Sequence, residues 1–229
     1  KTGGSRSQHS DVTHDLVPSL LREARFLIST INGRPQEGRK VVLTMTVQTA
    51  DVFEPSGATT FEGFFGTPTV SVTGAAGFIG SHLVERLLQL GCHVIGIDDF
   101  DPWYSPHQKR SNLFAAANNS KFELVDGNLS PEIAREAFSR SSVVFHLAGR
   151  PGVQDSWGEG FVDSSRRNIE LTQRVYEASV DSQVERVVYA SSSLIYGSGA
   201  TSLDVSPEPR PISPYGVSKL VGEQLAHVY

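Results

Sequence analysis

Three glycines spaced three residues apart, Gly74, Gly77 and Gly80, lie where an apolar run changes to a helical pattern, in the stretch VSVTGAAGFIGSHL (70–83). In a strand-turn-helix unit, the first glycine permits a tight turn, the second lets the backbone approach a pyrophosphate, and the third allows close helix packing. The amino end of the helix then offers free N–H groups and the positive end of its dipole to an anion. The spacing therefore predicts a dinucleotide-binding turn.

An acidic residue follows this turn where a dinucleotide site needs one. Asp98 ends the next apolar run, HVIGID (93–98), eighteen residues beyond Gly80. At the carboxyl end of a strand, its carboxylate can accept hydrogen bonds from an adenosine ribose, and its charge repels a 2′-phosphate. The sequence therefore predicts NAD as the cofactor, in preference to NADP.

A phenol and an ammonium stand four residues apart near the carboxyl end of the chain. Tyr215 and Lys219, in SPYGVSKL (213–220), therefore share one face of a helix. A phenol is a poor base at neutral pH because its pKa is about 10, and a nearby ammonium lowers that pKa. A serine run (191–193) ends the upstream strand VVYASSS and can bring a hydroxyl to Tyr215. This pattern is typical of proton transfer to and from a substrate hydroxyl.

The elements that must position these residues alternate from residue 69 onward. Amphipathic patterns predict helices at 78–90, 131–139, 163–180 and after Ser213-Pro214, which is a good N-cap and N1 pair. Apolar runs predict strands at 69–74, 93–98, 121–127, 142–149 and 185–193. Apolar strands between amphipathic helices indicate an α/β fold, a doubly wound parallel sheet of the Rossmann type.

The chain divides near residue 67. Residues 1–67 are interpreted as an accessory or partly disordered N-terminal segment, with an amphipathic helix over 14–31 and a strand at 41–47; residues 68–229 form the predicted NAD-binding domain. The first part holds seven basic and seven acidic residues, so the net charge of −5 belongs to the second part. An acidic domain without basic clusters argues against nucleic acid and anionic membranes as partners.

Several residues of types that often occur in functional sites have a simpler structural interpretation here. Cys92 is the single cysteine, so a reducing, cytoplasmic compartment is expected. The seven histidines show no ligand spacing, and no metal site is predicted. His146, inside an apolar strand, is interpreted as a core histidine with satisfied ring nitrogens, and Arg166-Arg167 as a solvated helix face. Trp103 and Tyr104 are open candidates for a ligand contact or a loop anchor.

Six motifs in order give the chain a wider resemblance: TGAAGFIGSHL, GIDDF, FHLAG, NIELT, ASSSLIYG and SPYGVSK. Over residues 69–229 it resembles the extended short-chain dehydrogenase/reductase family, in its NAD-dependent epimerase/dehydratase group. The resemblance implies that Ser192, Tyr215 and Lys219 are catalytic, because Ser192 precedes Tyr196 by four residues as the family pattern requires. It implies a cofactor site made of Gly74, Gly77, Phe78, Ile79, Gly80, Asp98, Asn128, Leu129, Leu147, Ala148, Gly149, Asn168, Tyr215 and Lys219.

Within the group, the resemblance favours nucleotide-sugar 4-epimerases. Ser193 and Leu194 stand where sugar-nucleotide 4,6-dehydratases carry an Asp-Glu pair, which disfavours water elimination. The stretch GIDDFDPWYSPHQKRSNL (96–113) looks like the UDP-glucuronate 4-epimerase branch, although Gln154 replaces the usual arginine of that branch. The resemblance therefore implies 4-epimerisation of a UDP-hexose or UDP-hexuronate through a 4-keto intermediate.

Two other classes remain alternatives: a dehydrogenase or reductase that releases NADH, and a non-catalytic NAD-binding module. The resemblance ends before the C-terminal lobe that grips the nucleotide-sugar in the family, so the domain is expected to be incomplete. Family members often dimerise through two helices per subunit. The helix at 163–180 and the one after Pro214 are therefore candidates for a homodimer interface.

Overall fold

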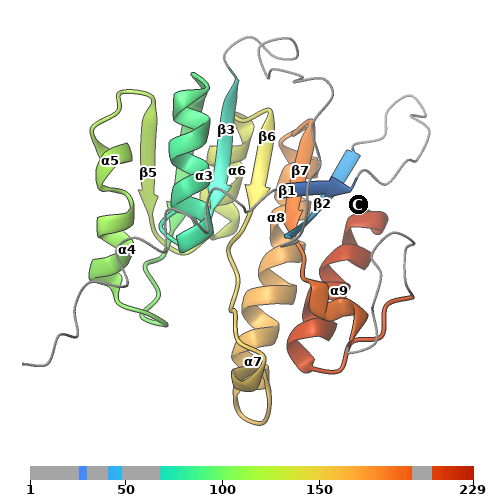
Figure 1. The fold of residues 1–229 in the computed structure, drawn as a ribbon. Coiled ribbons are helices and arrows are strands. Elements are labelled where there is room, and N and C mark those ends of the chain that lie inside the picture. Colours follow the sequence, from blue (N-terminus) through green and yellow to red (C-terminus); the bar gives the residue numbers. More distant parts are fainter. Residues whose placement is uncertain (1–25, 30–40, 48–67, 198–207) are drawn as a thin grey trace, which may run out of the picture.

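The computed structural model describes residues 26–29, 41–47, 68–197 and 208–229. The described residues form a seven-stranded sheet with the order β1-β2-β7-β6-β3-β4-β5 (Figure 1). Its strands are β1 (Phe26–Ser29), β2 (Val41–Val47), β3 (Thr69–Thr73), β4 (His93–Asp98), β5 (Phe122–Asp126), β6 (Val143–His146) and β7 (Arg186–Ala190).

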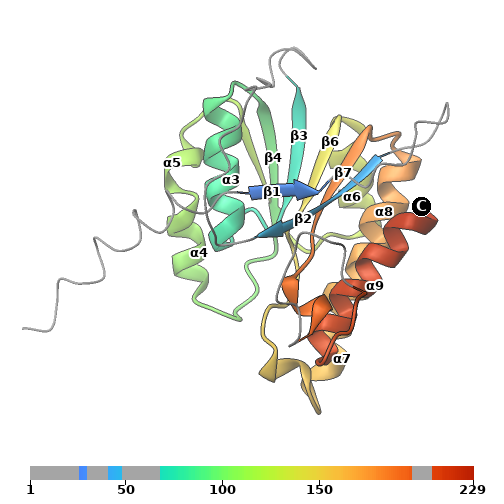
Figure 2. The ribbon, with the colours of Figure 1, turned by 45° about the vertical axis from the view of Figure 1, so that its right-hand side comes forward.

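Helices cover both faces of this sheet (Figures 1 and 2). One face packs against α3 (Phe78–Gln89) and α5 (Phe114–Ala117). Helix α4 (Pro106–Asn112) comes directly before α5 in the chain. The other face packs against α6 (Pro131–Ser139), α8 (Leu171–Asp181) and α9 (Pro214–Val228). Shorter elements connect them: a 3-10 turn η1 (Gln154–Ser156), helix α7 (Gly160–Ser165), a π-helix η2 (Arg166–Glu170) and a 3-10 turn η3 (Ser193–Tyr196).

The alternation of side chains along each strand explains the two layers. In β4, Val94 packs with the α3 side of the core, whereas Ile95 and Ile97 pack with the α6 and α8 side. Because successive side chains in a strand point to opposite faces, an uninterrupted apolar run is the pattern of a strand buried on both sides. The predicted doubly wound α/β fold is confirmed.

The path of the chain creates a topological switch point. From β3 the chain runs to β4 and β5 on one side, and then returns to β6 and β7 on the other side of β3. All of these neighbours pair in parallel, so their carboxyl ends meet at one edge. In such sheets, ligands bind in the crevice outside this edge, where the strand order reverses.

Two strands from the N-terminal segment extend the sheet. The predicted strand at 41–47 is β2, which pairs in parallel with β7 from Val41 opposite Arg186. The helix predicted over 14–31 is wrong at 26–29, where β1 pairs antiparallel with β2; the rest of that helix lies outside the described residues. A short apolar run such as FLIS suits a helix or a strand, and the sheet partner decides. The domain boundary at residue 67 stays a prediction.

Candidate active site

A pocket of about 880 Å³ lies at the carboxyl edge of the sheet. Segments that are far apart in the sequence supply its walls: the turn after β3, the ends of β4 to β7, and the first turns of α9. It brings together thirteen of the residues predicted to bind a cofactor: Gly74, Gly77, Phe78, Ile79, Gly80, Asp98, Asn128, Leu129, Leu147, Ala148, Gly149, Tyr215 and Lys219.

The glycine turn has the geometry that its spacing predicts. Gly74 adopts φ of +71°, and a Cβ there would lie 2.8 Å from the backbone nitrogen of Ala148. A Cβ on Gly80 would lie 2.0 Å from the carbonyl oxygen of Gly74, so α3 starts in direct contact with the turn. No side chain caps α3 at Gly77, whereas serines cap α4, α6 and α9. The first N–H groups of α3 are therefore open to a ligand in the pocket.

Asp98 is held rigidly at the end of β4. Its carboxylate accepts hydrogen bonds from the backbone N–H groups of Ala76, at 3.0 Å, and Phe100, at 2.8 Å. The ammonium of Lys109, one of the two lysines that are buried among the described residues, lies 3.1 Å from Oδ1 of Asp98. Both residues line the pocket, so this ion pair places a fixed acceptor and a fixed donor at the pocket wall.

Sequence reasoning missed Lys109 as a site residue. It lies on α4, a helix that was not predicted, although the signal was present: Ser105 followed by Pro106 is an N-cap and N1 pair. Tyr104, just before this helix, donates a hydrogen bond to the carbonyl of Ala76 at 3.2 Å and lines the pocket, so it acts as a loop anchor.

The predicted catalytic residues meet on the α9 side of the pocket. The Ser192 hydroxyl lies close enough to the Tyr215 phenol to lower its pKa, and Ser213 caps the helix that carries Tyr215 by accepting from the N–H of Gly216 at 3.1 Å. The ammonium of Lys219 donates to the carbonyl of Ala190 at 3.1 Å. Ser192 itself does not line the pocket, whereas its neighbour Ser191 does.

The protonation of this group differs from the expectation. Burial raises the pKa of Tyr215, and the nearby Ser192 hydroxyl offsets the shift only in part. The lowered pKa expected from Lys219 is not found, because its ammonium is directed to Ala190 and burial dominates. Burial also lowers the pKa of Lys219 to about 8, so this side chain remains mainly charged at neutral pH.

Asn168 is placed behind the pocket wall. It is 1% exposed and lies in the π-helix η2. Its amide oxygen accepts from the backbone N–H of Arg150 at 2.7 Å, while its amide nitrogen donates to the carbonyl of Arg150 and to the Ser218 hydroxyl. The described side chain thus joins the loop after β6 to α9, and its predicted direct contact with a cofactor stays a prediction.

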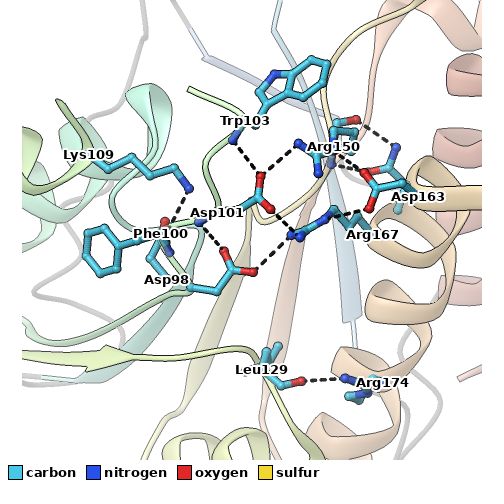
Figure 3. A network of polar contacts seen from close by, with 12 residues as sticks. Asp98, Phe100, Asp101, Trp103, Lys109, Leu129, Arg150, Asp163, Arg167 and Arg174 are labelled. Carbon is cyan, nitrogen blue, oxygen red and sulfur yellow. Dashed lines mark hydrogen bonds and ion pairs between the residues drawn. The ribbon is translucent and has the colours of Figure 1, made fainter. Parts of the chain in front are cut away.

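An ionic network crosses one side of the pocket (Figure 3). Asp101, in the loop after β4, pairs with Arg150 and with Arg167. Both guanidinium groups also pair with Asp163 on α7, and Arg167 reaches Asp99 at 3.1 Å. We call these five residues the ionic strap. The interpretation of Arg167 as a solvated helix residue is therefore wrong, because the fold brings three carboxylates to it.

The rims of the pocket are closed at two further points. The Trp103 ring packs on the guanidinium of Arg150, with 4.5 Å between the ring centroid and Cζ. At the other end, Arg174 of α8 donates to the carbonyl of Leu129 at 2.9 Å (Figure 3). Leu129 is buried and Asn128 lines the pocket beside it. These two contacts bound the pocket beside Arg150 and beside Leu129.

His146 is a satisfied core histidine, as predicted. It is fully buried, and Thr73 and Thr172 contact its two ring nitrogens at 2.8 and 3.0 Å. Burial, assisted by the Lys219 ammonium, lowers its pKa from 6.5 to about 3. The imidazole is therefore neutral in the folded chain.

This shift predicts a pH dependence of stability. In the unfolded chain the imidazole takes up a proton below pH of about 6.5, and the folded chain does so only near 3. We therefore expect the free energy of unfolding to decrease as pH falls below about 6.5, with His146 contributing up to about 1.4 kcal/mol per pH unit. Urea unfolding against pH should show a shallower dependence for His146→Gln. The exposed His107→Gln is the control, and equal dependence in all three chains would contradict the prediction.

Comparison with known proteins agrees with this geometry. The family model described as the NAD dependent epimerase/dehydratase family matches residues 70–229. The chain belongs to this family. The uncharacterized UDP-glucose epimerase YtcB of Bacillus subtilis is 42% identical over 161 residues, covering 70% of this chain and 51% of that relative. The UDP-glucose 4-epimerase of Mycolicibacterium smegmatis is 37% identical over 167 residues, covering 69% and 50%.

Solved members of the epimerase/dehydratase family share the fold. The UDP-glucuronic acid 4-epimerase of Bacillus cereus, in complex with UDP-glucuronic acid and NAD, is 40% identical with a TM-score of 0.64, covering 70% of this chain and 52% of that protein. The chain spans about half the length of the relatives it matches. None of its described helices has the length and apolar character to cross a bilayer, and the described residues hold no cluster of three potential metal ligands.

Proposed function

We propose that this chain carries the cofactor-binding and proton-transfer half of an NAD-dependent 4-epimerase acting on a UDP-hexose or UDP-hexuronate. The observation that carries the proposal is the meeting of Ser192, Tyr215 and Lys219 with the glycine turn and Asp98 at one sheet edge. Relatives that act on UDP-glucose and UDP-glucuronate support this substrate class.

The residues present fit the cofactor. The uncapped start of α3 and the bare Cα of Gly77 leave room and N–H donors for a diphosphate, and the Asp98–Lys109 pair suits a ribose. Phe78, Ile79 and Gly80 would bind the diphosphate, Asn128 and Leu129 the adenine, and Leu147, Ala148 and Gly149 the nicotinamide side. When bound, NAD would accept a hydride from C4 of the sugar and return it to the opposite face of the same carbon.

The chain's own residues handle the proton. Tyr215, in its phenolate form, takes the proton of the sugar 4-hydroxyl, and it returns the proton when the 4-keto group is reduced. Ser192, which lies beside Tyr215, would donate a hydrogen bond to the sugar 4-oxygen. Lys219 is charged, lies one helical turn from Tyr215 and lines the pocket, where it would contact the nicotinamide ribose. Because burial raises the pKa of Tyr215, activity should increase with pH above neutrality.

The direct test is product analysis with NAD and either UDP-glucuronate or UDP-glucose. Appearance of the 4-epimer without net NADH is the expected result. Accumulation of NADH would instead identify a dehydrogenase, and a 4-keto-6-deoxy product a dehydratase, which Ser193 and Leu194 disfavour. NAD binding without any turnover would identify a binding module.

Cofactor selectivity should depend on Asp98. Asp98→Ala removes the acceptor for the ribose and frees the Lys109 ammonium, so we expect NAD affinity to fall about tenfold or more and the preference over NADP to narrow. Isothermal titration with both nucleotides measures this. Asp126→Ala, which removes a half-exposed carboxylate at the end of β5, is the control and should leave affinity unchanged. Equal loss in both variants would contradict the assignment.

The ionic strap should slow release of the cofactor. It joins the loop after β4 to α7 and η2 beside the pocket (Figure 3), and salt screens its partly exposed pairs. We expect Asp101→Asn to increase the rate of NAD release several-fold at low salt. The variant should also remove most of the salt dependence of this rate. Stopped-flow displacement measures the rate. Arg110→Gln, which breaks a pair outside the strap, should retain the salt dependence of the unmodified chain.

Two further proposals concern context. A homodimer through α8 and α9 is supported by apolar side chains that remain exposed there, including Val180 and Val217. A cytoplasmic location is supported by Cys92, which is a free, buried thiol. Sedimentation measurements and fractionation test these two proposals.

A further inference from the structure

A chain of hydrogen bonds runs through the core beneath the pocket and ends at two parts of its wall. It begins at the backbone N–H of Ala148, which donates to the Thr73 hydroxyl at 3.2 Å. Thr73 contacts Nδ1 of His146 at 2.8 Å, and Nε2 of His146 contacts the Thr172 hydroxyl at 3.0 Å. Thr172 then donates to the carbonyl of Asn168 at 2.7 Å. We call this series the His146 relay.

The chemistry of the groups determines the direction of every bond in the relay. Thr172 has one hydroxyl hydrogen, which the carbonyl of Asn168 accepts, so Thr172 must accept from Nε2–H of His146. A neutral imidazole then leaves Nδ1 as an acceptor, and the Thr73 hydroxyl donates to it. Thr73 in turn accepts from Ala148. A single tautomer of His146 satisfies all five groups.

The neutral state of the imidazole is maintained by its surroundings. His146 is fully buried, and the Lys219 ammonium, the charged group that acts on it, disfavours a second positive charge. Its ring also lies beside that of Tyr189, with 5.7 Å between centroids. An imidazolium would place N–H groups on both sides and leave the Thr73 hydroxyl hydrogen without its acceptor. No other protonation state of His146 therefore satisfies all the hydrogen bonds of the relay.

Each end of the relay holds a different part of the proposed site. Thr73 and His146 are the last residues of the adjacent strands β3 and β6, and the relay adds a side-chain link where their backbone ladder ends. The Thr73 end holds Ala148, which lines the pocket. The Thr172 end holds the backbone of Asn168, whose side chain supports Arg150 and the Ser218 hydroxyl on α9. One buried ring thus links the cofactor wall to the helix that carries Tyr215.

We propose that His146 is a positioning residue, which sets the place of Ala148 through Thr73 and the place of Asn168 through Thr172. This inference rests on the proposed function, because it assigns a role in binding NAD and in turnover. His146 touches no reacting atom. Its effect is transmitted by two threonine hydroxyls, and the two halves of the relay can therefore be broken separately.

Two substitutions separate the halves. In His146→Asn, the amide oxygen can replace Nδ1 as the acceptor for Thr73, but the side chain is too short to reach Thr172. In His146→Gln, the amide nitrogen can replace Nε2 as the donor to Thr172, and the Thr73 half is lost. His146→Phe keeps the buried ring and removes both halves. Tyr176→Phe is the matched control, since it deletes one buried hydrogen bond, to the carbonyl of Gly222 on α9.

The experiment measures NAD affinity by calorimetry, turnover with the UDP-sugar, and the unfolding temperature of each variant. We expect His146→Asn to keep NAD affinity within about threefold and to lose turnover, and His146→Gln to lose about tenfold in NAD affinity. His146→Phe should show both losses, while Tyr176→Phe should lose stability alone. The affinity comparison remains decisive if turnover is not observed in this chain.

Distinct outcomes separate the inference from the proposed function. If the unmodified chain fails to bind NAD, the proposed function fails. If it binds NAD and the His146 variants lose NAD affinity only in proportion to the fall in their unfolding temperature, then His146 is structural and the inference is overturned. Equal affinity in the Asn and Gln variants would also overturn it.

Discussion

Replacing Tyr215 with phenylalanine is expected to lower turnover by a factor of about 10³, within the range that a positioned acid-base group contributes. The phenylalanine ring still lines the pocket, but no group remains to take the proton of the sugar 4-hydroxyl. NAD affinity should change little, because the phosphate and ribose contacts lie elsewhere in the pocket. Product analysis with the UDP-sugar and calorimetry with NAD measure the two quantities separately.

Tyr104→Phe is the matched control for this prediction. Tyr104 also lines the pocket, but its hydroxyl is already used as a donor to the carbonyl of Ala76. We expect its removal to leave turnover within a few-fold of the unmodified chain. If Tyr215→Phe retained full activity, or if both variants lost activity equally, Tyr215 would not be the acid-base residue.

Replacing Gly80 with alanine is expected to destabilise the chain by about 3 kcal/mol and to abolish NAD binding. The added Cβ would lie 2.0 Å from the carbonyl oxygen of Gly74 and 3.1 Å from Cα of Ala75, so α3 must move away from the turn. Both contacts are backbone atoms, which cannot rotate aside as a side chain does. Urea unfolding gives the loss of stability, and calorimetry gives the loss of binding.

Gly127→Ala provides the control for the glycine prediction. Gly127 also lines the pocket, but a Cβ there meets the Ile133 side chain at 3.5 Å, an ordinary van der Waals distance. Its stability should stay within about 0.5 kcal/mol of the unmodified chain. A Gly80 variant as stable as the Gly127 variant would show that the turn can relax, and the assigned role of the third glycine would then be wrong.

The elements with a clear period were predictable. The helix expected at 131–139 is α6 with the same bounds, and the strand expected at 93–98 is β4. The long helix expected at 163–180 continues through three elements, because a π-helix (166–170) separates α7 from α8. The periodicity of the sequence gives no indication of this π-helix. It directs the Asn168 side chain to the backbone of Arg150 and the Arg167 side chain to Asp101.

Elements without a clear period were missed. Helix α4 is short and polar, and it is stabilised by its Ser105 cap and by the Lys109–Asp98 ion pair rather than by a wide apolar face. Helix α5 has only four residues, which is too short to show a helical period. Strand β1 lies within the helix that the sequence predicts over 14–31, because the short run FLIS suits either structure until a pairing strand is present. In both cases the deciding contact comes from a distant part of the chain or from a cap.

By itself, the sequence determined the alternating α/β order, the glycine turn, the acidic end of β4 and the Tyr-Lys pair. These features depend on local periods of side chains and on turn chemistry, which act over a few residues. Other properties depend on the folded chain: the Lys109–Asp98 ion pair, the place of Asn168 behind the pocket wall, the pairs of Arg167 with Asp99 and Asp101, and the raised pKa of Tyr215. Those properties come from burial and from contacts between residues far apart in the chain, which no local pattern records.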